Sequence, residues 1–441
     1  MHRGEGMSGS RLSNLQTIAY GLPGLPLAVL LLPLFITVPT YYAEDLGLGF
    51  ATVGLVLLFA RAWDVLTDPL IGFLSDRTHT RFGRRRPWLL AGAPLMIVGA
   101  WTMFRPPDEV NALYLATATI TLYLGGTMVM LPYTAWAAEL SSDYYERSRI
   151  AGAREAALVI GTLGAMVVPA LFGVDRALIM DGTAIALLIF VPLTVGAALM
   201  ALPDPPVPRD TAVPPHIGLK SLCRNRPFRL LISAYFVNGI AYGLPATLFL
   251  VYAEHVLRRP DWSWTLLIIY FASAILALPV WLAVSRRIGK RRTWITAMIM
   301  ATAGFWPAVL LGPDDLLWFI MICVWTGLPL GAELVMPPSM QAEVIDADTA
   351  KTGARRAGTL FGLWGVATKI PLALGVGIAF PILGLVGFNG NSGSNSSLSL
   401  LVLAMLYGLT PVAFKLLAIR LLWNYPLDTD GSLAVTDDRC T

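Results

Sequence analysis

Long apolar runs, separated by short polar stretches, repeat along the whole chain. A helix that crosses the hydrocarbon core of a bilayer needs about 20 mainly apolar residues, and twelve runs come close to this length or exceed it. They lie near residues 15–43, 50–75, 88–105, 110–138, 152–172, 182–202, 229–252, 262–285, 293–311, 315–338, 357–388 and 398–424. The pattern predicts an all-α polytopic membrane protein with twelve transmembrane helices.

The composition supports this prediction. Hydrophobic residues fill 56% of the 441 positions and only 14% are charged, whereas a soluble chain carries about 25% charge. The first apolar run is too long for a signal-peptide core and lacks a clear cleavage site, so we expect a retained first helix. The cysteines Cys223, Cys323 and Cys440 are scattered, which favours neither a disulfide framework nor a metal knuckle.

A linker divides the chain into two parts. Residues 203–228 are rich in proline and basic residues, which is typical of a linker, here a cytoplasmic one. It separates an N-terminal half, 1–202, from a C-terminal half, 229–424. A polar segment, 425–441, follows as a cytoplasmic tail. We therefore expect two bundles of six helices each.

Matching loops suggest that the halves are repeats. The loop between spans two and three reads R-F-G-R-R-R-P-W (81–88), and the loop between spans eight and nine reads R-I-G-K-R-R-T-W (287–294). Gly152-Ala153-Arg154 follows span four, and Gly353-Ala354-Arg355 follows span ten. Matching motifs in matching loops predict parallel repeats, as in a transporter whose substrate site lies between its halves.

The distribution of Lys and Arg sets the expected orientation. With both termini and the loops after even-numbered spans in the cytoplasm, 25 of the 32 basic residues lie on that side. Only four lie on the other side: Arg105, Arg176, Arg258 and Arg259. Three fall inside spans: Arg61, Lys369 and Lys415. We expect a multi-pass protein of the cell (inner) membrane with cytoplasmic termini.

The second span, R-A-W-D-V-L-T-D-P-L (61–70), holds charges that a bilayer disfavours. Asp64 and Asp68 are four residues apart and share one helix face with Arg61. Each unpaired charge would cost about 2.5–3.5 kcal/mol on insertion scales, so they need a polar interior and cations. The protein itself offers Arg61 and Lys369, which lies deep in span eleven.

Two interpretations of this charged group remain open. Carboxylate and hydroxyl oxygens suit a hard cation such as Na⁺, and Thr127 in span four can add a hydroxyl. Ion or proton binding would relieve the repulsion between the aspartates. The alternative is a set of fixed salt bridges that only holds span two against span eleven.

At these residues the sequence resembles the glycoside–pentoside–hexuronide:cation symporters of the major facilitator superfamily, whose best-known member is melibiose permease. The stretches 61–90, 130–154 and 342–375 resemble the family's helix 2 with its following loop, helix 4 with its loop, and helix 11 with the preceding loop. The residues A-Y-G-L-P-G (19–24) resemble the start of helix 1. The resemblance covers nearly the whole chain and implies the major facilitator fold, with twelve helices in two six-helix halves.

Carried over by position, the resemblance assigns roles to six residues. Asp64 and Asp68 match the family's cation-site aspartates and Thr127 a threonine that assists them. Lys369 matches a lysine close to that site, and Arg61 and Arg154 match arginines that support the cavity. Melibiose permease also uses two acids to hold sugar hydroxyls, and here those positions are Ala28 and Met130. Galactoside recognition of that type is therefore not expected.

Other residues are candidates for the substrate cavity. Glu333 in span ten can contact a substrate hydroxyl or amine, or it caps the kink before Pro337 or pairs with a neighbour. The remaining candidates are Tyr20, Tyr133, Asn238, Tyr242 and Trp364. For each aromatic residue among them the alternative is core packing or a place in the aromatic belt at the membrane interface.

Charged residues at the cytoplasmic ends are expected to form gating contacts. They are Asp76, Arg77, Arg81, Arg84, Glu139, Arg287, Glu343 and Arg355. Glu139 and Glu343 occupy equivalent places and can pair with Arg154 and Arg355. His2, His79, His216 and His255 are expected outside the spans, which disfavours a histidine proton relay or an intramembrane metal. No P-loop, G-x-S-x-G or H-E-x-x-H motif appears, which disfavours ATP coupling and hydrolysis.

The sequence thus predicts a secondary active transporter rather than an enzyme. It would couple Na⁺ or H⁺ to symport of a sugar or other small organic solute by alternating access, with no cofactor besides the coupling ion. Its expected partners are the solute and the lipid bilayer, with no nucleic acid, and it would work as a monomer. Three alternatives are a sodium-coupled carrier of lysolipids or other amphipathic solutes, a proton-driven exporter and a non-transporting membrane scaffold.

Overall fold

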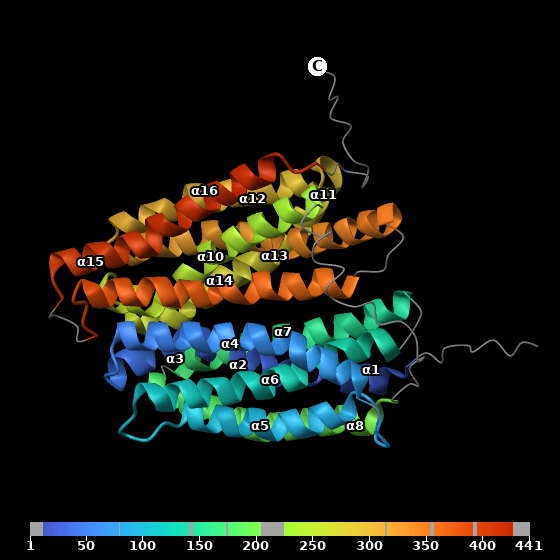
Figure 1. Cartoon of the computed structure of the whole chain (residues 1–441). Helices are drawn as coiled ribbons and strands as arrows, with labels where there is room; N and C mark the ends of the chain where they lie inside the picture. The colour runs from blue at the N-terminus through green and yellow to red at the C-terminus, as the bar shows by residue number, and fades with distance from the viewer. Residues whose placement is uncertain are drawn as a thin grey trace, which may run out of the picture. The chain divides into compact units, whose positions relative to one another are not determined.

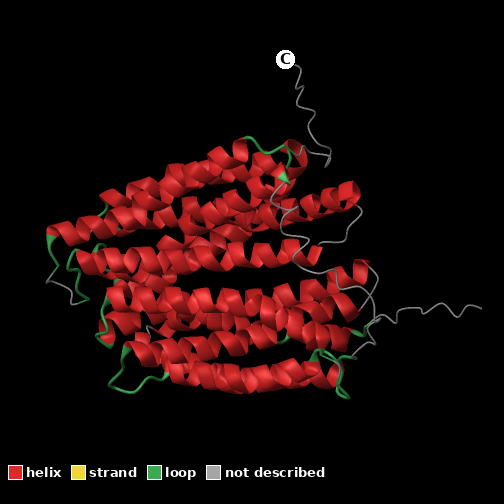
Figure 2. Ribbon diagram, in the orientation of Figure 1, coloured by secondary structure: helices red, strands yellow, loops and turns green. Residues whose placement is uncertain are grey.

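The computed structural model of the chain describes residues 12–78, 80–140, 144–172, 175–203, 225–313, 315–352, 357–390 and 395–426. These residues form helices joined by short loops and contain no strands (Figure 2). Twelve helices among them are long and apolar enough to cross a membrane. The prediction of an all-α, twelve-span membrane protein is confirmed.

The chain forms two compact units. Unit 1 comprises Met1–Leu48 and Phe59–Asp210, and unit 2 comprises Gly49–Leu58 and Thr211–Thr441. The predicted halves, linker and tail stay predictions, because residues 204–224 and 427–441 lie outside the described residues.

Unit 1 contains the first six spans except for the first turns of the second, and Figure 1 draws these helices in blue to green. Its helices are α1 (Asn14–Gly21), α2 (Gly24–Leu32), α3 (Val38–Thr40), most of α4 (Phe50–Arg77), α5 (Arg86–Phe104), α6 (Ala112–Leu140), α7 (Tyr144–Phe172) and α8 (Arg176–Ala201), with π-helical turns at Pro33–Thr37 and Tyr41–Asp45.

Unit 2 contains the first turns of α4 and the last six spans. Its helices are α10 (Arg226–His255), α11 (Ser263–Ile288), α12 (Lys290–Phe305), α13 (Leu316–Thr352), α14 (Ala357–Leu385), α15 (Ser397–Ala404) and α16 (Thr410–Trp423). Two 3₁₀ turns, Pro260–Trp262 and Trp306–Leu310, and a π-helical turn, Met405–Leu409, connect or extend them.

Prolines divide the first span into short pieces. Ser13 caps α1, since its hydroxyl accepts the Gln16 backbone N–H and its own N–H donates to the Gln16 side chain. Pro23, Pro33 and Pro39 then interrupt the run, and the segment continues through π-helical turns. A proline lacks the N–H that would bond to the carbonyl four residues earlier, so the ladder of helix bonds shifts at each one.

Two helices extend beyond the predicted spans. α7 begins at Tyr144, eight residues before the predicted span 152–172, so the motif Gly152-Ala153-Arg154 lies inside a helix and not in the loop after span four. α13 continues to Thr352, past the predicted end of span ten at residue 338. Hydropathy marks only the part of a helix in hydrocarbon, and a helix with polar side chains can continue into water. Both helices therefore extend past an end of the predicted spans 152–172 and 315–338.

Glycines allow two helix pairs to approach closely. A Cβ added to Gly125 of α6 would lie 2.2 Å from the backbone nitrogen of Met96 in α5. In unit 2, a Cβ added to Gly375 of α14 would lie 2.5 Å from the carbonyl of Gly243 in α10. Small residues at such contacts let helix backbones pack tightly in membranes, where burial of apolar surface adds little.

Arginines of the two matching loops make similar contacts. Arg86 donates to the carbonyl of Leu202, just after the last helix of unit 1, at 2.6 Å. Arg291 donates to the carbonyl of Tyr425, just after the last helix of unit 2, at 2.7 Å. Each loop therefore holds the end of the final span in its own unit, as parallel repeats would.

Candidate functional site

Helix α4 places the three charged residues of the second span together in unit 1. Arg61 Nη1 lies 3.0 Å from Asp64 Oδ2, and both side chains are buried. Asp68 follows one turn later and is partly buried. Because these residues are three and four positions apart, the helix brings them to one face.

Thr127 joins the two aspartates from helix α6. Its Oγ1 lies 3.0 Å from Asp64 Oδ1 and 2.9 Å from Asp68 Oδ1. A hydroxyl carries a single proton, so only one of the two carboxylates can accept it at any moment. The other contact is favourable only when that carboxyl is protonated or a cation lies among the oxygens.

Aromatic rings hold Arg61 in place. Its guanidinium carbon lies 4.4 Å from the ring centroid of Tyr123 and 5.0 Å from that of Phe35. The rings stabilise the buried cation through their electron-rich faces. With both aspartates ionised, Arg61, Asp64 and Asp68 together carry one net negative charge, which one monovalent cation balances.

Tyr20 and Tyr133, both predicted to line the cavity, brace α1 against α6. Tyr133 donates to the carbonyl of Tyr20 at 2.5 Å, and Tyr20 donates to the carbonyl of Tyr133 at 3.2 Å. Their rings stack with centroids 4.7 Å apart, and both side chains are buried. Because each hydroxyl already has an acceptor, these contacts favour a structural role, and a role in substrate binding stays a prediction.

The two positions that carry acids in melibiose permease differ in their surroundings. Ala28 of α2 is buried against α7, where a Cβ added to Gly161 would lie 2.9 Å from the Ala28 Cβ. Met130 of α6 is 49% exposed. An acidic side chain at position 28 would therefore meet a packed helix contact.

In unit 2, Glu333 lies in a buried polar cluster from three helices. Its Oε2 accepts from the Tyr242 hydroxyl at 2.6 Å and from Asn238 Nδ2 at 3.1 Å, both on α10. Lys415 of α16 lies 2.5 Å from the same oxygen and 2.8 Å from Oε1. Of the predicted alternatives for Glu333, pairing with a neighbour is thus the one seen.

Lys415 is the main residue of this cluster for which the sequence suggested no role. It was noticed as a basic residue within a span, but Glu333 is 82 positions away. No local periodicity connects two residues so far apart, so only the fold could reveal the pair.

Lys369 and Trp364 lie on α14 in unit 2. Lys369 is partly buried, and Trp364 stacks on Tyr235 of α10 with ring centroids 4.0 Å apart. The neighbour of Lys369, Thr368, is 3.2 Å from the Tyr235 hydroxyl. Since Asp64 and Asp68 belong to unit 1, a pairing of Lys369 with them stays a prediction.

Several of the expected cytoplasmic gate residues make contacts within their own units. Arg84 donates to the carbonyl of Ser75 at 3.4 Å, and the guanidinium groups of Arg77 and Arg81 lie over nearby phenylalanine rings. Arg287 is exposed in the last turn of α11. The side chains of Asp76 and Glu139, and all of Arg355, lie outside the described set.

Arg154 and the gate residue Glu343 each form an ion pair with a described residue. Arg154 pairs with Glu155 at 2.6 Å, and its buried Nε has no hydrogen-bond partner among the described residues. Glu343 pairs with Lys290 of α12 at 2.5 Å. The predicted pairs of Arg154 with Glu139 and of Glu343 with Arg355 stay untested.

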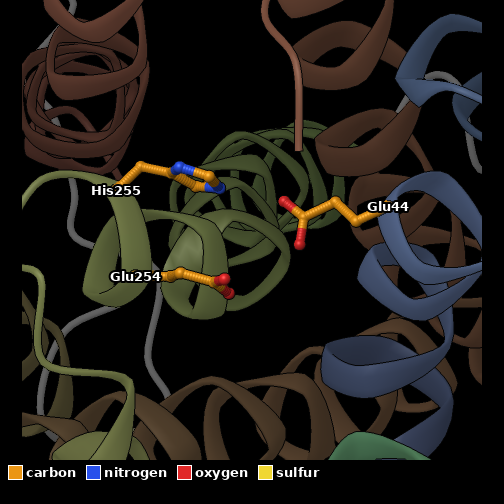
Figure 3. A group of neighbouring side chains, drawn as sticks. All are labelled: Glu44, Glu254 and His255. Atoms are coloured by element: carbon orange, nitrogen blue, oxygen red, sulfur yellow. The ribbon is translucent and has the colours of Figure 1, made fainter. Parts of the chain in front are cut away.

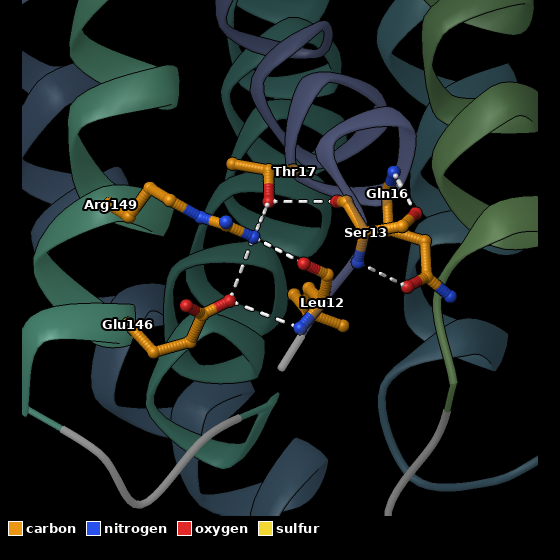
Figure 4. A network of polar contacts seen from close by, with 6 residues as sticks. All are labelled: Leu12, Ser13, Gln16, Thr17, Glu146 and Arg149. Atoms are coloured by element: carbon orange, nitrogen blue, oxygen red, sulfur yellow. Dashed lines mark hydrogen bonds and ion pairs between the residues drawn. The ribbon is translucent and has the colours of Figure 1, made fainter. Parts of the chain in front are cut away.

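A further polar network ties the start of the first span to α7 (Figure 4). Glu146 accepts the Leu12 backbone N–H at 3.1 Å and pairs with Arg149 at 2.9 Å. Arg149 also donates to the Leu12 carbonyl and, at 2.8 Å, to the Thr17 hydroxyl. The segment that contains Glu146 and Arg149 resembles the family's loop after helix 4, but that resemblance does not predict these contacts with Leu12 and Thr17.

One expectation about histidine was wrong. His255 is the last residue of α10, within the seventh span, and is buried. It follows Glu254 on the same helix (Figure 3). Its ring meets that of Phe388 edge to face, with the ring centroids 4.9 Å apart. Glu44, also drawn there, belongs to unit 1, where it pairs with Arg176 at 2.6 Å. The predicted apolar run ends at residue 252, whereas α10 continues to His255. The prediction from hydropathy therefore did not include this residue.

Comparison with known proteins identifies the family. Residues 18–429 match the family described as MFS/sugar transport protein, and the chain belongs to it. The glucuronide carrier protein homolog of Escherichia coli is 26% identical, over 88% of this chain and 87% of that protein. The sodium-dependent lysophosphatidylcholine symporter 1 of Gallus gallus is 23% identical, over 96% of this chain and 88% of that protein.

A solved structure shows the same fold. The nucleoside transporter NupG matches with a TM-score of 0.68 and 12% identity, over 94% of this chain and 100% of that one. The major facilitator fold and the resemblance to glycoside–pentoside–hexuronide symporters are thereby confirmed. The chain is a multi-pass secondary active transporter that carries small solutes by symport.

Proposed function

We propose that the coupling ion of this symporter is Na⁺ or H⁺ and that it binds among Asp64, Asp68 and Thr127. The supporting observation is the position of the Thr127 hydroxyl, within 3.0 Å of an oxygen of each aspartate. Carboxylate and hydroxyl oxygens are the ligands that hard cations prefer. A proton on one carboxyl would satisfy the same three oxygens.

Ion binding would prepare the solute site. It removes the repulsion between the aspartates and lets α4 and α6 settle in one arrangement. Solute then binds near the midplane and the two halves rock against each other. When the ion leaves, the ammonium group of Lys369 competes for the two aspartates. This competition discourages the conformational change from taking place while the ion site is empty. Tight coupling retained in Lys369→Ala would contradict that last step.

The proposed solute is a sugar or a sugar derivative. The family description and the similarity to a glucuronide carrier homolog support this class. Asn238, Tyr242 and Trp364 are the proposed polar and aromatic contacts of such a solute, and the first two already contact Glu333 in the structure. The proposal does not include galactosides of the melibiose type, because Ala28 has no side-chain acceptor and the thioether of Met130 is only a weak one, whereas a carboxylate accepts strongly from sugar hydroxyls.

A second candidate solute is a lysolipid. The similarity to a sodium-dependent lysophosphatidylcholine symporter supports it, and the loss of acidic sugar contacts at Ala28 and Met130 fits an amphipathic solute. Uptake into proteoliposomes under an inward Na⁺ or pH gradient separates the candidates, with a labelled glucuronide and labelled lysophosphatidylcholine as probes. We expect gradient-driven uptake of the glucuronide, abolished in Asp68→Asn. Uptake of the lysolipid alone would favour the second candidate.

We further propose that the protein lies in the inner membrane with both termini in the cytoplasm and works as a monomer. The concentration of Lys and Arg in the loops after even-numbered spans supports the orientation. The solute would cross unchanged, without catalysis and without a nucleic-acid partner.

A further inference from the structure

The ammonium group of Lys415 is surrounded by oxygens of other residues. Its Nζ lies 2.5 Å and 2.8 Å from the two carboxylate oxygens of Glu333 and 3.3 Å from Asn238 Oδ1. The ring centroid of Tyr242 is 4.5 Å away. Lys415, Glu333 and Asn238 are all buried.

This surrounding matches the needs of an ammonium ion. A protonated amine has three N–H donors, and three acceptor oxygens face it here. The aromatic face of Tyr242 adds the attraction that rings have for cations. The carboxylate is held independently of Lys415, because Tyr242 and Asn238 both donate to Glu333 Oε2.

The oxygens and the ammonium come from different helices. Asn238 and Tyr242 are on α10, Glu333 is on α13, and Lys415 is on α16. Removal of the lysine head group therefore leaves the carboxylate, the amide and the ring with their mutual hydrogen bonds. What remains is a preformed shell for a small monovalent cation.

We propose that Glu333, Asn238 and Tyr242 form a second monovalent-cation site, in unit 2, which is suited to ammonium ions. In the native protein the side chain of Lys415 occupies this site. The tethered ammonium excludes free ions from Glu333. A consequence, which rests on the proposed function, is that only the site at Asp64 and Asp68 exchanges an ion, so that each cycle carries one. The existence of the occupied site does not rest on that function.

A plain salt bridge makes a different prediction. If Lys415 and Glu333 only balance each other's charge, loss of the lysine destabilises the protein and no small amine restores it. If the surrounding groups form a cation site, a free ion that can donate hydrogen bonds should replace the lost head group.

The test uses the purified full-length variant Lys415→Ala. Its Tm is measured in ammonium or methylammonium chloride and, at equal ionic strength, in tetramethylammonium chloride, whose cation has no N–H. We expect a Tm below that of the wild type in tetramethylammonium and a partial recovery in the other two salts. For a Kd of about 10 mM, 100 mM ammonium shifts the unfolding equilibrium about tenfold.

Two variants serve as controls. Lys415→Met fills the space of the lysine stem, and Lys415→Ala with Glu333→Gln removes the carboxylate, so neither should respond to ammonium. An equal Tm of Lys415→Ala in all three salts would overturn the proposal. If this variant unfolds during purification, the yield of monodisperse protein in methylammonium against tetramethylammonium replaces the Tm, and equal yields overturn it.

The outcome is independent of the cation site in unit 1. Asp68→Asn should abolish a response to Na⁺ and leave the ammonium response of Lys415→Ala intact. Failure of the two proposals can therefore be told apart.

Discussion

The hydroxyl of Thr127 lies 2.9 Å from a carboxylate oxygen of Asp68, on a different helix. The same hydroxyl is 3.0 Å from Asp64, so three oxygens converge although one hydroxyl proton can serve only one acceptor. One of the two carboxylate oxygens therefore lacks the hydroxyl proton as a hydrogen-bond donor. A cation or an additional proton among the three oxygens would compensate for this. The first predictions follow from this geometry.

Replacement of Thr127 by valine should weaken cation binding. Valine keeps the shape of threonine but removes the oxygen, and a hydrogen bond or ligand contact to a charged group is worth about 1.5–3 kcal/mol. We expect the Na⁺ concentration for half-maximal stabilisation to rise about tenfold or more. Thr119→Val is the matched control, because Thr119 lies on the same helix, is buried and donates only to its own helix. An equal change in both variants would refute the role of Thr127.

Removal of Arg61 should destabilise the protein strongly. Arg61→Met removes the guanidinium that pairs with the buried Asp64, and loss of one partner of a buried pair costs about 3–5 kcal/mol. The additional change Asp64→Asn should recover part of this loss, because it removes the remaining charge. Thermal unfolding of the two single variants and the double variant measures the coupling, and purely additive effects would show that the pair is not coupled.

Sequence and structure agree on the parts that depend on local pattern. Hydropathy located all twelve spans, and the four-residue spacing of Asp64 and Asp68 placed both on one face of α4. Hydropathy did not reveal how far α7 and α13 continue, because a helix outside the bilayer loses its apolar signal. The contact of Lys415 with Glu333 joins residues that are distant in sequence, and no periodicity predicts such a pair.

The brace between Tyr20 and Tyr133 gives a test of their predicted cavity role. Tyr133→Phe removes the hydrogen bond to the Tyr20 carbonyl, which should lower the free energy of unfolding by about 1 kcal/mol. If Tyr133 is a brace, Na⁺ binding and the KM of any transported solute should change little. Unchanged stability with a raised KM would instead assign Tyr133 to the substrate cavity.

Two neighbouring glycines of α6 should respond in opposite ways to alanine. In Gly125→Ala the new methyl group would lie 2.2 Å from the Met96 nitrogen, so the helices must separate at a cost of roughly 1–3 kcal/mol. A Cβ added to Gly126 would meet no atom of another helix within 4 Å, so Gly126→Ala should be neutral or stabilising by up to about 1 kcal/mol. Thermal unfolding of both variants provides the check, and equal Tm values would refute the tight contact of α5 and α6.

The central claim is that Asp64, Asp68 and Thr127 hold the coupling ion, and one measurement tests it without a known solute. The Tm of the purified wild type and of Asp68→Asn is recorded against NaCl, with KCl at equal ionic strength as the control, at several pH values. A ligand that binds only the folded state raises stability by RT ln(1 + [L]/Kd). We predict a Na⁺-specific rise in the wild type that is absent in Asp68→Asn. An identical Na⁺ response in both proteins would contradict the site, and no response at any pH would leave only the proton or a fixed salt bridge.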